Sequence, residues 1–153
     1  EVYLEQLHTF GDPGRDPRGW IISVAYLGLT HPEANVLRAG DDAAHTAWFP
    51  VDRVPALAFD HAQIVALARQ RLRERVQTSP IGFYLLPCRF TLNELQSVYE
   101  AILGGRLDRR NFRRKMLRSG LLRETGQFQS GEGRPAKLYE LRSGAEGIAP
   151  LRF

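Results

Sequence analysis

The amino-acid sequence predicts an α+β chain built from two modules, residues 1–78 and residues 79–153. The first half reads as strands and loops followed by one helix, whereas the second half reads as two helices followed by a hairpin. Charge divides the chain at the same place. Residues 1–76 carry 8 basic and 10 acidic residues, a net −2, and residues 77–153 carry 13 and 7, a net +6. Such a split suggests that the second module meets an anionic partner.

The composition is that of an ordinary globular protein. The 153 residues are 43% hydrophobic and include no run of about 18 apolar residues that could span a membrane. No signal-peptide pattern opens the sequence, and a single cysteine, Cys88, agrees with a reducing compartment, so we expect a cytoplasmic protein. No metal site is expected, because the histidines lack the spacing of metal ligands: His8, His31, His45 and His61.

The first module is expected to hold three strands and one helix. The three strands are expected at residues 3–10, 20–30 and 45–51. The second is a long run of β-branched and aromatic residues and is expected to be central in its sheet. A loop rich in glycine and proline joins the first two, at residues 11–19. The apolar spacing becomes helical from residue 60 to 76, and Asp60 stands where a helix cap is expected. A solvated face of this helix is expected to carry Arg69, Arg71, Arg73 and Arg75.

The second module is expected to be helix, helix and hairpin. Thr91 followed three residues later by Glu94 is a capping box, in which each side chain binds the other residue's backbone N–H, so a helix begins there. Gly104 is expected to end that helix. Asp108 can cap a second helix, and Gly120 follows its end. Two strands then flank a polar loop, and the three segments are residues 120–128, 129–135 and 136–142.

The second helix of this module is unusually basic. Six of the eleven residues from 108 to 118 are basic. At about 100° per residue, the buried side is predicted to hold Phe112, Met116 and Leu117. Like charges one turn apart repel, so an all-arginine ridge made of Arg110, Arg114 and Arg118 gains nothing in water, whereas phosphates would supply the counter-charge. The basic face is predicted to include Arg110, Asn111, Arg114, Lys115 and Arg118. A solvated basic face is the competing interpretation.

Two capped helices followed by a hairpin are the layout of a winged helix, whose second helix enters the major groove of DNA. Arginine pairs with guanine there and asparagine pairs with adenine. Arg109 and Arg113 fall inside or beside the apolar arc and are further candidates for DNA contact. Arg134 and Lys137, at the hairpin tip, would reach a flanking phosphate or the minor groove, unless they are ordinary solvated turn residues.

Several stretches resemble the Nudix-related transcriptional regulators, the NrtR group. They are "YLEQLHTFGDPGRDPRG", "WFPVDRVPALAFDH" and "FTLNELQSVYEAILGGRLDRRNFRRKMLRSGLL", and the ending "GRPAKLYEL" resembles the wing of many winged-helix regulators. The third stretch is the most specific, because it is long and follows the other two in the correct order. The resemblance implies that residues 1–78 are the C-terminal portion of a Nudix-like α/β/α effector domain and that residues 79–153 are a winged helix-turn-helix domain.

The same resemblance implies a homodimeric regulator of genes for NAD metabolism or pentose use. Such a protein binds a palindromic operator in double-stranded DNA, and its Nudix-like domain senses ADP-ribose or a related nucleotide. The candidate effector residues are Arg15, Asp16 and Arg18, since guanidinium forks match phosphate oxygens. A salt bridge within the loop or a contact between subunits is the competing interpretation of these three residues.

The Nudix hydrolase box, G-x5-E-x7-REU-x-EE-x-G-U with U a bulky aliphatic residue, is absent from these 153 residues. Its glutamates hold the divalent metals that act on a pyrophosphate. We therefore predict no catalytic residues, no enzyme activity and no cofactor for this chain. Magnesium is expected only if the missing box is present and intact. In the family "YLEQL" follows the box, so we expect the chain to begin part-way through the Nudix domain. Exposed apolar surface would then pair with a second copy or with a separate missing piece.

Two other functions stay open at this point. One is a Nudix hydrolase, similar to an ADP-ribose pyrophosphatase, whose catalytic half is not in this chain. The other is a non-enzymatic module whose basic face binds RNA or an acidic protein. Magnesium-dependent release of AMP from ADP-ribose would support the hydrolase, whereas a sequence preference for duplex DNA would support the regulator.

Overall fold

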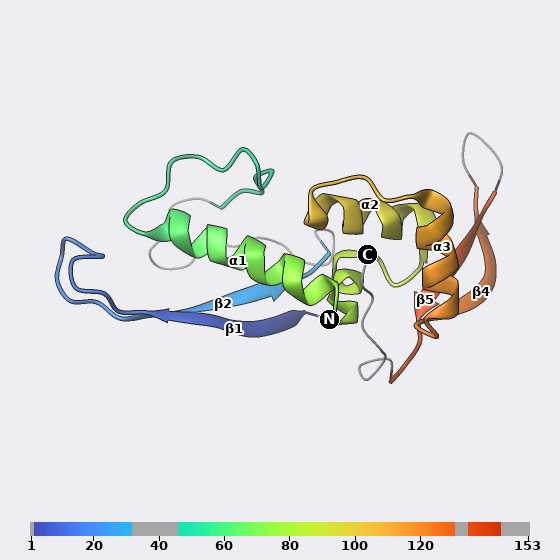
Figure 1. The fold of residues 1–153 in the computed structure, drawn as a ribbon, viewed down its shortest axis with the longest axis horizontal. Helices are drawn as coiled ribbons and strands as arrows, with labels where there is room; N and C mark the ends of the chain where they lie inside the picture. The colour runs from blue at the N-terminus through green and yellow to red at the C-terminus, as the bar shows by residue number, and fades with distance from the viewer. Residues whose placement is uncertain (1, 32–45, 131–134, 145–153) are drawn as a thin grey trace.

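The computed structural model describes residues 2–31, 46–130 and 135–144. It has the predicted α+β class, although one predicted strand is not observed and the elements η2 and β3 were not expected. The elements, shown in Figure 1, are β1 (Tyr3–Phe10), β2 (Ser23–Leu29), α1 (His61–Val76), the 3-10 helix η2 (Pro80–Leu85), β3 (Phe90–Thr91), α2 (Leu92–Leu103), α3 (Arg109–Arg118), β4 (Leu122–Gln129) and β5 (Ala136–Leu141). The molecule is elongated, with α1 lying along the β1–β2 hairpin at one end and with α2, α3, β4 and β5 at the other.

Strands β1 and β2 form an antiparallel hairpin in which Tyr3 pairs with Leu29 and Phe10 pairs with Ser23. The predicted strands at residues 3–10 and 20–30 are therefore present, although the second is shorter. Its expected central place was wrong for the described part of the chain, because β2 pairs there with β1 alone. The strand expected at residues 45–51 was also wrong, since residues 46–51 are irregular and Pro50 begins a turn by accepting a bond from the Arg53 N–H.

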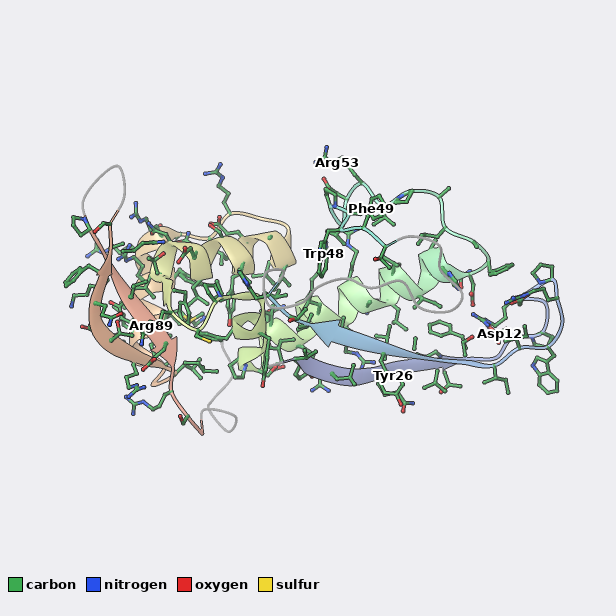
Figure 2. All side chains as sticks on the ribbon, turned by 180° about the vertical axis from the view of Figure 1, so that it is seen from behind. Asp12, Tyr26, Trp48, Phe49, Arg53 and Arg89 are labelled. Atoms are coloured by element: carbon green, nitrogen blue, oxygen red, sulfur yellow. The ribbon has the colours of Figure 1, made fainter. Side chains whose placement is uncertain are left out.

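The two faces of the hairpin differ in exposure. The inner face buries Leu7 and Leu29, whereas the outer face leaves apolar side chains in solvent. Figure 2 shows one of them, Tyr26, on the side of the hairpin opposite α1. The exposed apolar residues of the outer face are Leu4, Val24 and Tyr26. An uncovered apolar sheet face of this kind was expected from the sequence, and what covers it stays a prediction.

Helix α1 is tied to β1 by a carboxylate–arginine cluster. Glu5 Oε1 accepts hydrogen bonds from Arg71 Nη1 at 2.9 Å and from Arg75 Nη2 at 2.7 Å, and Glu5 Oε2 accepts one from the Tyr3 hydroxyl at 2.5 Å. Of the α1 arginines expected on a solvated face, Arg75 is exposed, as predicted, and also pairs with Glu5, whereas Arg71 is only partly exposed. These two side chains join segments that lie far apart in the sequence.

The helix ends of the second half follow the sequence signals. Thr91 Oγ1 accepts from the Glu94 N–H at 3.2 Å, and the Glu94 carboxylate accepts from the Thr91 N–H at 2.7 Å, so the predicted capping box is confirmed. Gly104 ends α2 in the left-handed region at φ +77°, where glycine avoids the strain of a side chain. Asp108 caps α3 by accepting from the Asn111 N–H at 2.7 Å.

One apolar core lies beneath these two helices and the wing. It draws residues from α1, η2, α2, α3 and the strands, and its members are Val76, Phe83, Leu86, Phe90, Leu92, Leu95, Tyr99, Phe112, Met116, Leu121 and Tyr139. Val76 precedes the boundary predicted after residue 78, yet it is fully buried in this core. Gly82 packs so tightly here that an added Cβ would lie 3.1 Å from Tyr99 Cε2 and 3.3 Å from Val76 Cγ2.

The wing is the three-stranded antiparallel sheet β3–β5–β4. Phe90 pairs with Tyr139, and Leu122 pairs with Leu141. The register of β4 against β5 shifts between Glu124 and Phe128, around Gly126 at φ +73°. Both hairpin strands predicted from the sequence are thus present. In the described ranges no helix is long and apolar enough to cross a membrane, and no group of three His, Cys, Asp or Glu side chains could hold a metal ion.

Candidate nucleic-acid interface

Helix α3 is anchored through a narrow apolar edge. Phe112 and Met116, one turn apart, are 2% and 0% exposed, and the Phe112 ring meets the Tyr99 ring of α2 edge-on at 5.6 Å. A helix fixed along one edge must present the opposite face outward. That face carries the basic residues singled out in the sequence.

The outward face of α3 is basic. Arg110, Arg114 and Arg118 are exposed, and none of the three forms an ion pair with a described carboxylate. Arg114 Nη2 instead donates to the side-chain oxygen of its neighbour Asn111 at 2.7 Å. The structure therefore brings together Arg114 and Asn111, the two residue types that read guanine and adenine. Lys115 lies at the border of this face and is only partly exposed.

Two further arginines of α3 lean toward the start of α2. Arg109 Nη2 and Arg113 Nη1 each lie 3.4 Å from the side-chain oxygen of Asn93, which is the second residue of α2. Sequence reasoning left these arginines uncertain and missed Asn93 altogether. The signal for Asn93 was its place in the first turn of the helix preceding α3, where backbone N–H groups also point outward.

Leu117 corrects the predicted buried side of α3. It was expected to share the core with Phe112 and Met116, but its side chain is 52% exposed. The core contacts only a narrow sector of the helix around Phe112 and Met116, and Leu117 lies about 100° beyond Met116. An apolar side chain therefore stands among the outward arginines.

Of the two wing residues predicted to contact DNA, only Lys137 lies in the described part of the chain, and it already has a protein partner. Lys137 donates to the Glu124 carboxylate at 2.9 Å across the β4–β5 ladder, and this carboxylate raises the Lys137 pKa. The lysine therefore has a protein counter-charge, although both side chains are 53% exposed. Arg134, the other wing candidate, lies outside the described residues.

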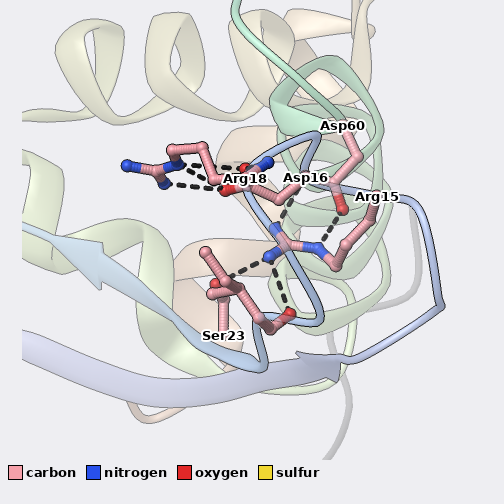
Figure 3. A network of polar contacts seen from close by, with 6 residues as sticks. Arg15, Asp16, Arg18, Ser23 and Asp60 are labelled. Atoms are coloured by element: carbon pink, nitrogen blue, oxygen red, sulfur yellow. Dashed lines mark hydrogen bonds and ion pairs between the residues drawn. The ribbon is translucent and has the colours of Figure 1, made fainter.

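The candidate effector loop between β1 and β2 is bound to the start of α1. Arg15 Nε and Nη2 each donate to the Asp60 carboxylate at 2.7 Å, and Arg15 Nη1 donates to Ser23 Oγ at 2.9 Å, as Figure 3 shows. The Arg15 side chain is only 6% exposed. Asp60 occupies the cap position of α1 but makes no side-chain cap bond, because its oxygens bind Arg15. Hydrogen bonding from Arg15 lowers the Asp60 pKa.

Asp16 and Arg18 form a second pair in the same loop. The Asp16 carboxylate accepts from Arg18 Nη2 at 2.7 Å and from the Arg18 N–H at 2.9 Å. These bonds, the side-chain ones first, lower the Asp16 pKa to about 2. Arg18 also lies over the Phe59 ring, 5.2 Å from its centroid, and 69% of its side chain is exposed. Of the three candidate effector residues, Arg18 thus offers the most accessible group.

Comparisons with known proteins agree with this geometry. Residues 82–141 match the family model described as the NrtR DNA-binding winged helix domain. The chain is 38% identical over 139 residues to the ADPR responsive transcriptional repressor NtrR of Acinetobacter baylyi, an alignment that covers 90% of this chain and 55% of that protein. The chain therefore spans little more than half the length of that relative.

Solved structures extend the likeness to both halves. A crystal structure of Shewanella oneidensis NrtR complexed with a 27mer DNA superimposes with a TM-score of 0.83 at 37% identity, covering 98% of this chain and 69% of that one. A MutT/nudix family protein from Enterococcus faecalis gives 0.69 at 30% identity, covering 92% and 62%. The fold is therefore Nudix-like in its first part and a winged helix in its second, and the chain belongs to the NrtR family.

Proposed function

We propose that this chain is part of a sequence-specific DNA-binding transcriptional regulator. One observation carries the proposal: the outward arginines of α3 meet no carboxylate among the described residues, in a winged helix that superimposes on a DNA-bound NrtR. Three like charges one turn apart are unfavourable in isolation. DNA phosphates remove that cost and release condensed cations on binding.

In the proposed complex, α3 lies in the major groove. Arg110, Arg114 and Arg118 form the ridge that faces the duplex, and Asn111 stands beside Arg114. The bond between Arg114 and Asn111 holds both side chains ready and exchanges for bonds to base edges on binding. Arg109, Arg113 and Asn93 gather where α3 meets the start of α2, a position suited to a backbone phosphate. Flanking contacts are proposed for Lys115, Arg134 and Lys137.

A nucleotide effector is part of the same proposal. The Acinetobacter relative is described as responsive to ADPR, and the loop between β1 and β2 holds guanidinium groups that suit a diphosphate. Arg18 would reach the ligand first, while Arg15 and Asp16 shape the loop through Asp60 and Arg18. We also propose a homodimer on a palindromic operator, and target genes of NAD or pentose metabolism, following the family.

A hydrolase remains the second candidate, favoured by the superposition on a MutT/nudix family protein. The 153 residues hold no Nudix box, so the glutamates that bind the catalytic metals in such enzymes are absent from this chain. We therefore propose that the chain itself does not turn over ADP-ribose. Incubation with ADP-ribose and magnesium, followed by chromatography for AMP, tests this. Sustained release of AMP by the purified chain would contradict it.

DNA binding is tested by fluorescence anisotropy with labelled duplexes at several salt concentrations. We expect a steep fall in affinity with salt, which reports phosphate contacts, together with a preference for one duplex sequence, which reports base contacts. Addition of ADP-ribose should shift the affinity. Salt-dependent binding without any sequence preference, or tighter binding to single-stranded RNA, would contradict the regulator and would indicate a non-specific nucleic-acid-binding module.

A further inference from the structure

Helix α3 exposes one large apolar side chain on its otherwise polar outward surface. Leu117 is 52% exposed, whereas Phe112 and Met116 of the same helix are buried at 2% and 0%. The exposed half of the Leu117 side chain lacks the stabilisation that burial would give, and contact with a phosphate would not stabilise an apolar group. A helix that bound only the DNA backbone would have no use for this side chain.

Helical geometry places Leu117 beside the arginine ridge, between the angular positions of Arg113 and Arg110. Residues three and four apart on a helix are neighbours, so Leu117 adjoins Arg113 and Arg114. It also lies close to the line of Arg110, two turns before it. Any surface that meets the arginine ridge along α3, about 15 Å in length, must therefore also cover Leu117.

The base edges of the major groove offer one apolar feature, the 5-methyl group of thymine. We propose that Leu117 is a specificity-determining residue that packs against a thymine 5-methyl group, next to the bases or phosphates met by Arg113 and Arg114. The inference rests on the proposed DNA-binding function and adds to it a preference for thymine at a defined position. Contact with the methyl group would also remove the exposed leucine from water.

The test removes the methyl group from the DNA and the side chain from the protein. A preferred duplex is first selected from a random-sequence library with the whole chain. It is then remade with deoxyuridine replacing one thymine at a time, which deletes the methyl group and leaves every hydrogen bond in place. We expect one replacement per contacted half of the site to weaken binding about fourfold, the value of one buried carbon group.

The Leu117→Ala variant should bind the thymine duplex about as weakly as the unmodified protein binds the uracil duplex. It should also no longer distinguish the two duplexes. Leu117→Met keeps an apolar contact and should retain the discrimination, which guards against a folding defect in the alanine variant. Val51→Ala removes an apolar side chain of similar exposure, 50%, from the turn that also carries Arg53, and should behave as the unmodified protein.

The outcomes separate this inference from the function on which it rests. Failure of the unmodified chain to prefer any duplex would overturn both. A clear sequence preference combined with indifference to every uracil replacement would overturn the role of Leu117 alone. Unchanged discrimination in Leu117→Ala would assign the methyl contact to another residue and would equally refute the inference.

Discussion

Neutralising Glu5 should weaken the attachment of β1 to α1 in a pH-dependent way. Hydrogen bonds from Arg75, aided by those from Tyr3 and Arg71 and opposed by partial burial, lower the Glu5 pKa from 4.5 to about 2. At about 1.4 kcal/mol per pKa unit, the upper limit of the stabilisation is about 3 kcal/mol. The Arg75 side chain is 45% exposed, so solvent screening reduces the expected loss in Glu5→Gln to about 1–2 kcal/mol at pH 7.

The direction of the pH effect follows from the lowered pKa. The charged form favours the folded state, so the contribution of Glu5 is complete above about pH 4.5 and disappears as the pH falls toward 2. Urea unfolding followed by circular dichroism, at steps between pH 7 and pH 3, should show the unmodified chain and Glu5→Gln converging on acidification. Glu124→Gln, whose pair with Lys137 is 53% exposed on both sides, is the control and should cost much less than Glu5→Gln. A constant difference between the two proteins at all pH values would refute the reasoning.

Three substitutions probe the winged helix. Thr91→Ala removes the cap of α2 and should lower the unfolding free energy by about 1 kcal/mol in urea titrations, a loss that Thr91→Ser should largely avoid. Phe112→Ala deletes a ring that is 2% exposed and should cost about 3–5 kcal/mol by the same measurement; a loss below 1 kcal/mol would place the ring outside the core. Arg114→Ala should weaken binding to the selected duplex by about 1–3 kcal/mol in anisotropy titrations. Arg53→Ala removes an equal charge from an exposed turn of the first part and should leave affinity nearly unchanged.

Local signals explain what could be predicted from the sequence. The capping box joins residues three apart, Asp108 binds an N–H three residues later, and Gly104 acts through its own φ. Each signal depends on a short stretch of chain, so each can be recognised in the sequence before the fold is known. The separation of apolar and basic residues on α3 can be recognised for the same reason, and it predicted most residues of the candidate interface.

Long-range contacts explain what could not be predicted. Arg15 and Asp60 are 45 positions apart, and Glu5 and Arg75 are 70 apart, so no spacing rule reveals that they pair. The same limit applies to Leu117. Its angular position on α3 follows from the sequence, but the width of the buried side of α3 depends on packing against α2 and the wing. Asn93 was missed because its partners come from the next helix.

The last turn of α1 has a mechanical meaning. Val76 packs tightly beside Gly82 and Tyr99, so the last turn of α1 shares a core with α2, the helix against which α3 packs. At the opposite end of α1, the Asp60 carboxylate forms an ion pair with Arg15 of the loop between β1 and β2. Helix α1 therefore connects the loop at residues 15–18, through Asp60, with the core beneath the arginine ridge, through Val76.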